Sequence, residues 1–174
     1  MITNFTNECL KGATKNFGQV FSYSLSASIK TYCNPRNKRR QNEIINISKC
    51  MNINKVQQKC SYLLTEYTEI LKRGASAKLS KHRVGYACCN YFKLLNQLES
   101  NISPFCNEKQ VKAITNFIRN LIQSLIDVAC LDFTDASDAC DKLPPLPNEK
   151  IKSQLPNSKT FVLPLIELFS NLEK

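Results

Sequence analysis

The chain has 174 residues, of which 43% are hydrophobic and 22% charged, and only four are glycine. This length and composition predict one folded domain with a sizeable core and argue against a disordered protein. No run of apolar residues approaches the 18 that a transmembrane helix needs. The formal net charge of +10 favours anionic partners, but without an RNA-binding motif or a zinc finger we do not expect nucleic acid.

The compartment follows from cysteine usage. The first residues, MITNFTNECL, lack the basic and apolar regions of a secretory signal, which fits either a cytosolic protein or a mature form with an added Met1. Nine cysteines spread over most of the chain favour an oxidising compartment, so we expect a secreted, extracellular protein. Sequons at Asn4, Asn46 and Asn101 are compatible with a secreted glycoprotein, although a chain this rich in Asn, Ser and Thr produces about as many by chance.

The first predicted helix covers residues 3–32, where apolar side chains recur every three or four positions. The stretch FSYSLSAS alternates like a strand, but it is much shorter than the helical pattern around it. Pro35 ends the helix because the residue before a proline avoids helical geometry. A second helical region runs from Asn42 to Arg73, split near MNIN, where Asn54 is expected to cap with Gln57. Gly74 stands where a glycine commonly follows a helix.

The third helix, from Val84 to Ile102, carries the adjacent cysteines Cys88 and Cys89. Neighbouring side chains on a helix point about 100° apart. Cys88 falls on the apolar seam that faces the core, and Cys89 lies one step round the helix. We therefore expect the pair to bond to two different neighbours and so to join this helix to two others.

The fourth helix begins after Asn107, with Gln110 in the capping-box position, and runs to about Cys130. Its apolar face is broad because Phe117 and Ile122 widen the seam. The seam itself consists of Val111, Ile114, Ile118, Leu121, Leu125 and Val128.

The last part of the chain changes character after Cys130. DFTDASDAC is expected to form a short helix capped by Thr134 or Asp135, and a proline-punctuated connector follows. The apolar stretch near the end predicts a terminal helix over 161–172 that docks into a groove of the core. We thus expect a disulfide-rich helical domain over 1–142, with the connector and terminal helix of 143–174 packed on that same domain.

The fold class that follows is all-α: a disulfide-stapled antiparallel helical bundle of four to five main helices, with the C-terminal apolar helix folded back. Nine cysteines leave one sulfur over after four disulfides, and off-seam Cys89 is the expected spare if the vicinal pair supplies it. Alternating helix directions place Cys33 near Cys50 and Cys106 at one end of the bundle. The expected framework draws on Cys9, Cys33, Cys50, Cys60, Cys88, Cys89, Cys106, Cys130 and Cys140.

Catalytic and metal chemistry find little support in the residues. No CxxC pair exists, and the sole histidine, His82, is nearly two helical turns from Cys88 and Cys89, about 10 Å along the axis. The nucleophile and phosphate-binding motifs are also absent. We therefore expect no enzyme, no metal site, no catalytic residue and no cofactor.

The vicinal pair also carries a resemblance. The order of cysteines in YACCNYFKLLNQLESNISPFC, FIRNLIQSLIDVAC and DAC, over residues 84–140, resembles invertebrate secreted cysteine-rich helical proteins, including the hemolymph-glycoprotein-like group. These proteins place adjacent cysteines on one helix and single cysteines at the bounds of the next. The resemblance implies an extracellular, non-enzymatic protein.

Two functions remain open. The first is a secreted binding protein that encloses a hydrophobic small molecule or lipid, with an expected lining of Leu95, Phe117, Leu121, Leu125 and Phe169. The second is an extracellular protein-interaction or structural component, such as an effector, venom or matrix protein, that dimerises through the odd cysteine or the terminal helix. For either function, the basic run offers a candidate contact for polyanions at Arg36, Lys38, Arg39 and Arg40.

Overall fold

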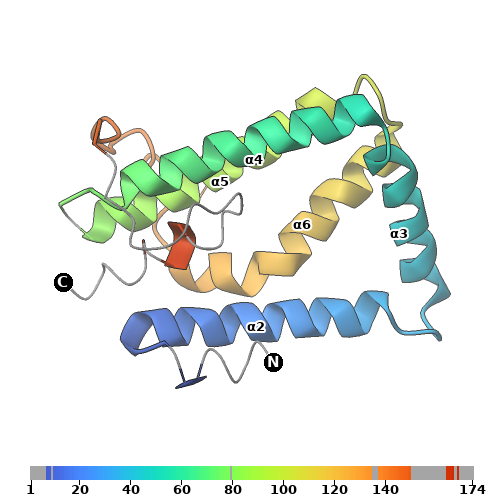
Figure 1. Ribbon diagram of the computed structural model, residues 1–174, viewed down its shortest axis with the longest axis horizontal. Coiled ribbons are helices and arrows are strands. Elements are labelled where there is room, and N and C mark those ends of the chain that lie inside the picture. The colour runs from blue at the N-terminus through green and yellow to red at the C-terminus, as the bar shows by residue number, and fades with distance from the viewer. Residues whose placement is uncertain are drawn as a thin grey trace.

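The computed structural model describes residues 7–8, 10–78, 80–134, 137–149, 164–166 and 168. This part of the chain is helical and contains no strand, which confirms the all-α class. The longer helices, seen in Figure 1, are α2 (Gly12–Tyr32), α3 (Lys38–Met51), α4 (Asn54–Gly74), α5 (Ser80–Ile102) and α6 (Glu108–Ala129).

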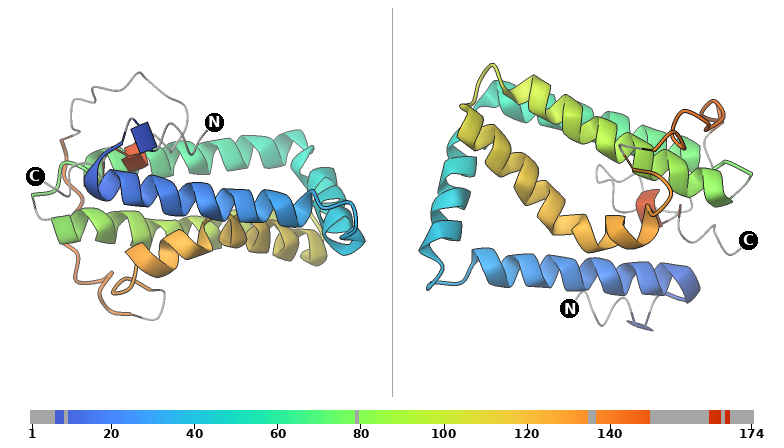
Figure 2. Two further views of the ribbon diagram at one scale, coloured as in Figure 1. Left: turned by 90° about the horizontal axis from the view of Figure 1, so that it is seen from below. Right: turned by 180° about the vertical axis from the view of Figure 1, so that it is seen from behind.

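The helices form two layers, one of α4 and α5 and the other of α2 and α6, and α3 crosses one end of both. α4 packs mainly on α5, whereas α2 packs mainly on α6. α6 also packs on α5, so it links the layers, and α3 stands across one end, where it meets α2, α4 and α6. Figure 2 shows the same arrangement from two other sides. Since α2 packs on neither α4 nor α5, the space between the layers must be filled by side chains from several elements.

Local capping explains where the helices begin, and it corrects two predictions. The predicted capping box at the start of α6 is confirmed, because Asn107 and Gln110 exchange side-chain and backbone hydrogen bonds of 2.9 and 3.0 Å. α3 starts earlier than predicted, because the side chain of Asn37 accepts from the Arg40 backbone N–H. The predicted Asn54 cap is wrong: Ile53 precedes α4 and makes no side-chain capping bond.

Gly74 has a different role from the one predicted. It is the last residue of α4 and has no positive φ, unlike Gly12. A Cβ on Gly74 would lie 3.1 Å from the Cβ of Tyr86. The glycine therefore allows α4 and α5 to approach closely at the turn that joins them.

Three disulfides join segments distant in sequence. Cys50–Cys106 joins the end of α3 to the turn before α6, so the expected closeness of these two cysteines is confirmed. The other two bridges, Cys88–Cys130 and Cys89–Cys140, both join α5 to the segment that follows α6. The vicinal pair thus has two partners as predicted, but these lie on one segment rather than on two helices.

The expectation that Cys89 is the exposed spare is wrong. Cys89 is bonded and only 4% exposed, because the segment after α6 folds over its side of α5. Phe133 and Cys140 pack there in one cluster with Cys88 and Cys89. A Cβ on Gly85 would lie 2.9 Å from the Phe133 ring, which shows how tightly this segment is applied to α5.

The free thiols of the described residues belong to Cys33 and Cys60, which contradicts their place in the expected disulfide framework. Cys33 is exposed at the C-terminal end of α2 and is not joined to Cys50 or Cys106. Cys60 is half-buried on α4. The expected role of Cys9 lies outside the described residues.

The described residues that follow Cys130 pack back on the helices, and those of the predicted short helix are not helical. Residues 131–134 and 137–143 form turns and coil, and the other predicted cap, Asp135, lies outside the described residues. The connector is held at the α4–α5 turn, where the Tyr86 hydroxyl donates to the Pro144 carbonyl and Arg73 donates to the Pro147 carbonyl. Further along, residues 164–166 and 168 are helical, and Leu165 and Leu168 are buried in the core.

Candidate ligand-binding cavity

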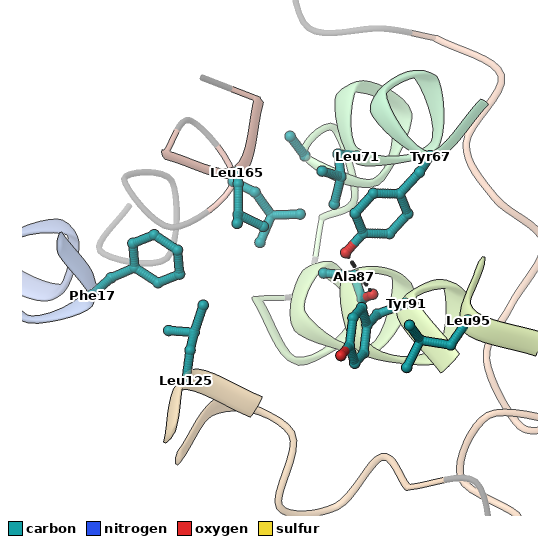
Figure 3. Packing of buried hydrophobic residues seen from close by; sticks show 10 residues of the cluster. Phe17, Tyr67, Leu71, Ala87, Tyr91, Leu95, Leu125 and Leu165 are labelled. Carbon is teal, nitrogen blue, oxygen red and sulfur yellow. Dashed lines mark hydrogen bonds between the residues drawn. The ribbon is translucent and has the colours of Figure 1, made fainter. Parts of the chain in front are cut away.

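An apolar cavity of about 280 Å³ lies between the two layers of helices. Every long helix contributes to its wall, from Phe21 on α2 to Ala129 on α6, and Leu165 adds a side chain from the C-terminal segment. Figure 3 shows the core beside it, with Phe17 and Leu125 on one side, and Tyr67 and Leu71 facing them across Leu165. The cavity exists because only α5 and α6 pack directly between the two layers, while α2 and α4 remain apart.

The inner face of α6 forms the largest part of the wall. Ile114, Ile118, Leu121 and Leu125 recur at three- and four-residue spacing, so they share one face of the helix, and all four line the cavity. The predicted seam fails at Val128, which is 66% exposed. A straight helix drifts off a strict seven-residue repeat, so Ile126 and Ala129 take over the wall at this end.

The structure brings together three of the five side chains expected to line a ligand site. Leu95, Leu121 and Leu125 all line the cavity. Phe117 points elsewhere on α6 and packs edge-on against Tyr32, with their ring centroids 5.0 Å apart. Phe169 lies outside the described residues.

Sequence reasoning missed the contribution of α4. None of the residues expected to line a ligand site lies on this helix, yet Cys60, Leu63 and Tyr67 all line the cavity. Leu64 also lines it and is 42% exposed. The wall of the cavity therefore approaches the surface at the partly exposed Cys60 and Leu64. Regular seam spacing alone does not distinguish a solid core from a hollow one.

The few polar atoms in the wall are neutral. The Tyr67 hydroxyl donates to the Ala87 carbonyl at 3.1 Å, and burial, followed by nearby Tyr91, raises the pKa of Tyr67. Burial also raises the pKa of the Cys60 thiol, so this sulfur stays protonated at neutral pH. The wall therefore presents hydrocarbon, sulfur and the hydroxyls of Tyr67 and Tyr91, and no charge.

The four basic residues of the predicted polyanion contact do not lie in one site. Arg36, Lys38 and Arg39 are exposed. Arg40 is half-buried and forms an ion pair of 2.6 Å with Glu43, and its guanidinium lies 5.4 Å from the centroid of the Tyr32 ring. Arg39 and Arg40 face a groove between α3 and α6, whereas Arg36 and Lys38 do not line it.

Other site types are not evident in the described part of the chain. Its His, Cys, Asp and Glu side chains form no group of three or more that could hold a metal ion. None of its helices is both long enough and apolar enough to cross a membrane. Comparisons of the chain with known protein families, with curated proteins and with solved structures found no match.

Proposed function

We propose that this chain is a secreted, non-enzymatic binding protein that encloses a small uncharged apolar molecule between its two helical layers. The observation that carries the proposal is the apolar cavity of about 280 Å³. Three disulfides support an extracellular location. The proposal includes a bundle on which residues 143–174 fold back, supported by the burial of Leu165 and Leu168.

The cavity wall defines the class of ligand. A water-sized group occupies about 30 Å³, so a cavity of about 280 Å³ holds roughly nine non-hydrogen atoms, near the lower end of ligand pockets. A carboxylate or ammonium inside it would have no oppositely charged partner in the wall, and burying an unpaired charge costs several kcal/mol. The ligand is therefore a short hydrocarbon, terpene, alcohol or ester rather than a long-chain fatty acid.

The test uses n-alcohols from hexanol to dodecanol and a cavity reporter. The chain contains no tryptophan, so a Leu121→Trp variant places one indole in the wall, and Val128→Trp is its exposed control on the same helix. Each added methylene should tighten binding about fourfold, from about 0.8 kcal/mol per buried CH₂, up to roughly nine non-hydrogen atoms. Beyond that length, the affinity should level off or fall.

The control variant and a charged analogue separate cavity binding from surface adsorption. Octanol should change the fluorescence of Leu121→Trp and leave that of Val128→Trp unchanged, and octanoate should bind at least tenfold more weakly than octanol. An absence of saturable binding by titration calorimetry with the unmodified protein, or an affinity with no dependence on chain length, would contradict the proposal.

A second function is favoured by the exposed Cys33 thiol. We propose as the alternative an extracellular interaction or structural protein that forms a disulfide-linked dimer through this residue. Non-reducing electrophoresis of the protein and of its Cys33→Ser variant tests it. A discrete dimer that reducing agent and the substitution both abolish supports the alternative, and a strictly monomeric protein counts against it.

A further inference from the structure

A groove of about 680 Å³, lined mainly by polar and charged residues, lies between α3 and α6 and shares no lining residue with the apolar cavity. Four asparagines face it, Asn42 and Asn46 from α3 and Asn116 and Asn120 from α6. Each pair is spaced four residues apart, which puts both side chains on one face of their helix. The groove therefore has an amide-bearing wall on either side.

These amides are available to a ligand. None of the four side chains forms a hydrogen bond within the part of the chain that the structure describes. The contact that Asn46 makes across the groove uses its backbone carbonyl, which accepts from the Gln110 side chain. Asparagine is a weak helix former, so these four residues lower the local stability of α3 and α6. Each amide offers two donors and an acceptor, a set that matches sugar hydroxyls.

The charges in the groove favour an anion. The groove contains Arg39, Arg40, Lys109 and Glu43, and the ion pair with Arg40 neutralises Glu43. Arg39 and Lys109 form no ion pair with any residue that the structure describes. Two uncompensated cations thus stand on opposite walls, among the free amides. No aromatic ring lines the groove, so it lacks the stacking surface that single-stranded nucleic acid uses.

We propose that the groove between α3 and α6 binds an acidic saccharide. Arg39 and Lys109 hold its sulfate or carboxylate groups, and Asn116 and Asn120, with the asparagines of α3, bond to its hydroxyls. This site is separate from the apolar cavity. Of the basic residues at positions 36–40, only Arg39 and Arg40 line it.

The experiment measures binding of a heparin-derived hexasaccharide by titration calorimetry at physiological salt. Protein made without glycosylation is used, because Asn46 belongs to a sequon. The Arg39→Gln/Lys109→Gln variant should bind at least tenfold more weakly than the unmodified protein. The Arg36→Gln/Lys38→Gln variant removes the same charge from outside the groove and should lose no more than twofold. Equal weakening in the two variants would show that only net charge attracts the saccharide and would overturn the proposal.

A second pair of measurements tests recognition of hydroxyls without a change of charge. Asn116→Ala/Asn120→Ala should weaken hexasaccharide binding about fivefold and leave binding of inorganic sulfate unchanged. An unaffected hexasaccharide affinity would overturn the proposal, as would a single-stranded oligonucleotide that binds as tightly with the same dependence on Arg39 and Lys109. Octanol binding, measured on every variant, should stay unchanged, so that failure of the groove and failure of the apolar cavity can be told apart.

Discussion

The two disulfides that leave the vicinal cysteines differ in one respect that can be measured. Cys88 and Cys130 both line the apolar cavity, whereas Cys89 and Cys140 do not. Replacing both cysteines of one bridge with alanine removes a similar constraint in either case. The Cys88→Ala/Cys130→Ala variant should therefore change ligand binding, and the Cys89→Ala/Cys140→Ala variant should not.

The loss of stability should be almost the same for the two variants. The bridges close overlapping loops, with sequence separations of 42 and 51, and each loop alone corresponds to about 4 kcal/mol of chain entropy. With one bridge intact, however, the other closes a much smaller ring, which consists of Cys88, Cys89 and residues 130–140 and so contains about 13 residues. The same relation then gives about 3 kcal/mol for loss of either bridge.

Urea unfolding and octanol titration check both parts of this prediction. Each variant should lose about 3 kcal/mol in its free energy of unfolding. Octanol affinity should change at least fivefold only where Cys88 and Cys130 are replaced, because smaller side chains there enlarge the cavity. If the variants lose equal stability but the Cys89→Ala/Cys140→Ala protein is the one that loses octanol binding, the assignment of the cavity is wrong.

Three further outcomes follow from other contacts. Gly85→Ala should lower the free energy of unfolding by about 1–3 kcal/mol through overpacking, and less in a Leu143→Ala background, because the added Cβ would lie 2.8 Å from that leucine; equal losses in both backgrounds would contradict this contact. Burial raises the pKa of Tyr67, so the folded protein favours the protonated hydroxyl more than the unfolded chain does. This contribution to the free energy of unfolding is complete below the ordinary tyrosine pKa of about 10 and is lost as the pH rises above it. Urea unfolding of Tyr67→Phe should accordingly show a shallower loss of stability above pH 10 than the unmodified protein. Burial likewise raises the pKa of the Cys60 thiol, so iodoacetamide should modify exposed Cys33 first, and octanol should protect Cys60 alone; equal rates by mass spectrometry would count against both the burial and the cavity.

Features set by neighbouring residues could be predicted closely. The capping box of Asn107 and Gln110 depends on residues three positions apart, and the structure has it as predicted. The break around Pro35 and the split near MNIN are local in the same way. The Asn54 cap failed although its pattern was suitable, because the chain entered α4 one residue earlier, at Ile53. Such predictions reach their limit where two neighbouring residues can begin a helix with similar energy.

Contacts between distant segments could not be predicted in this way. The sequence showed that Cys89 is off the seam of its helix, but only the folded segment around Phe133 and Cys140 decides that this side is covered. In the cavity, Leu95, Leu121 and Leu125 were identifiable as core residues from their spacing. The space between them depends on how far apart α2 and α4 are held, which no single helix encodes.

The sequence by itself determined the helical class, the residues near which the long helices end, the abundance of cysteine and the apolar face of α6, because these depend on periodicity and on side chains a few residues apart. The tertiary structure alone decided which cysteines pair, where the core is hollow, and that Lys109 of α6 stands across a groove from Arg39 of α3. These features depend on how the same helices pack against one another. They become defined only when all of the helices are placed together.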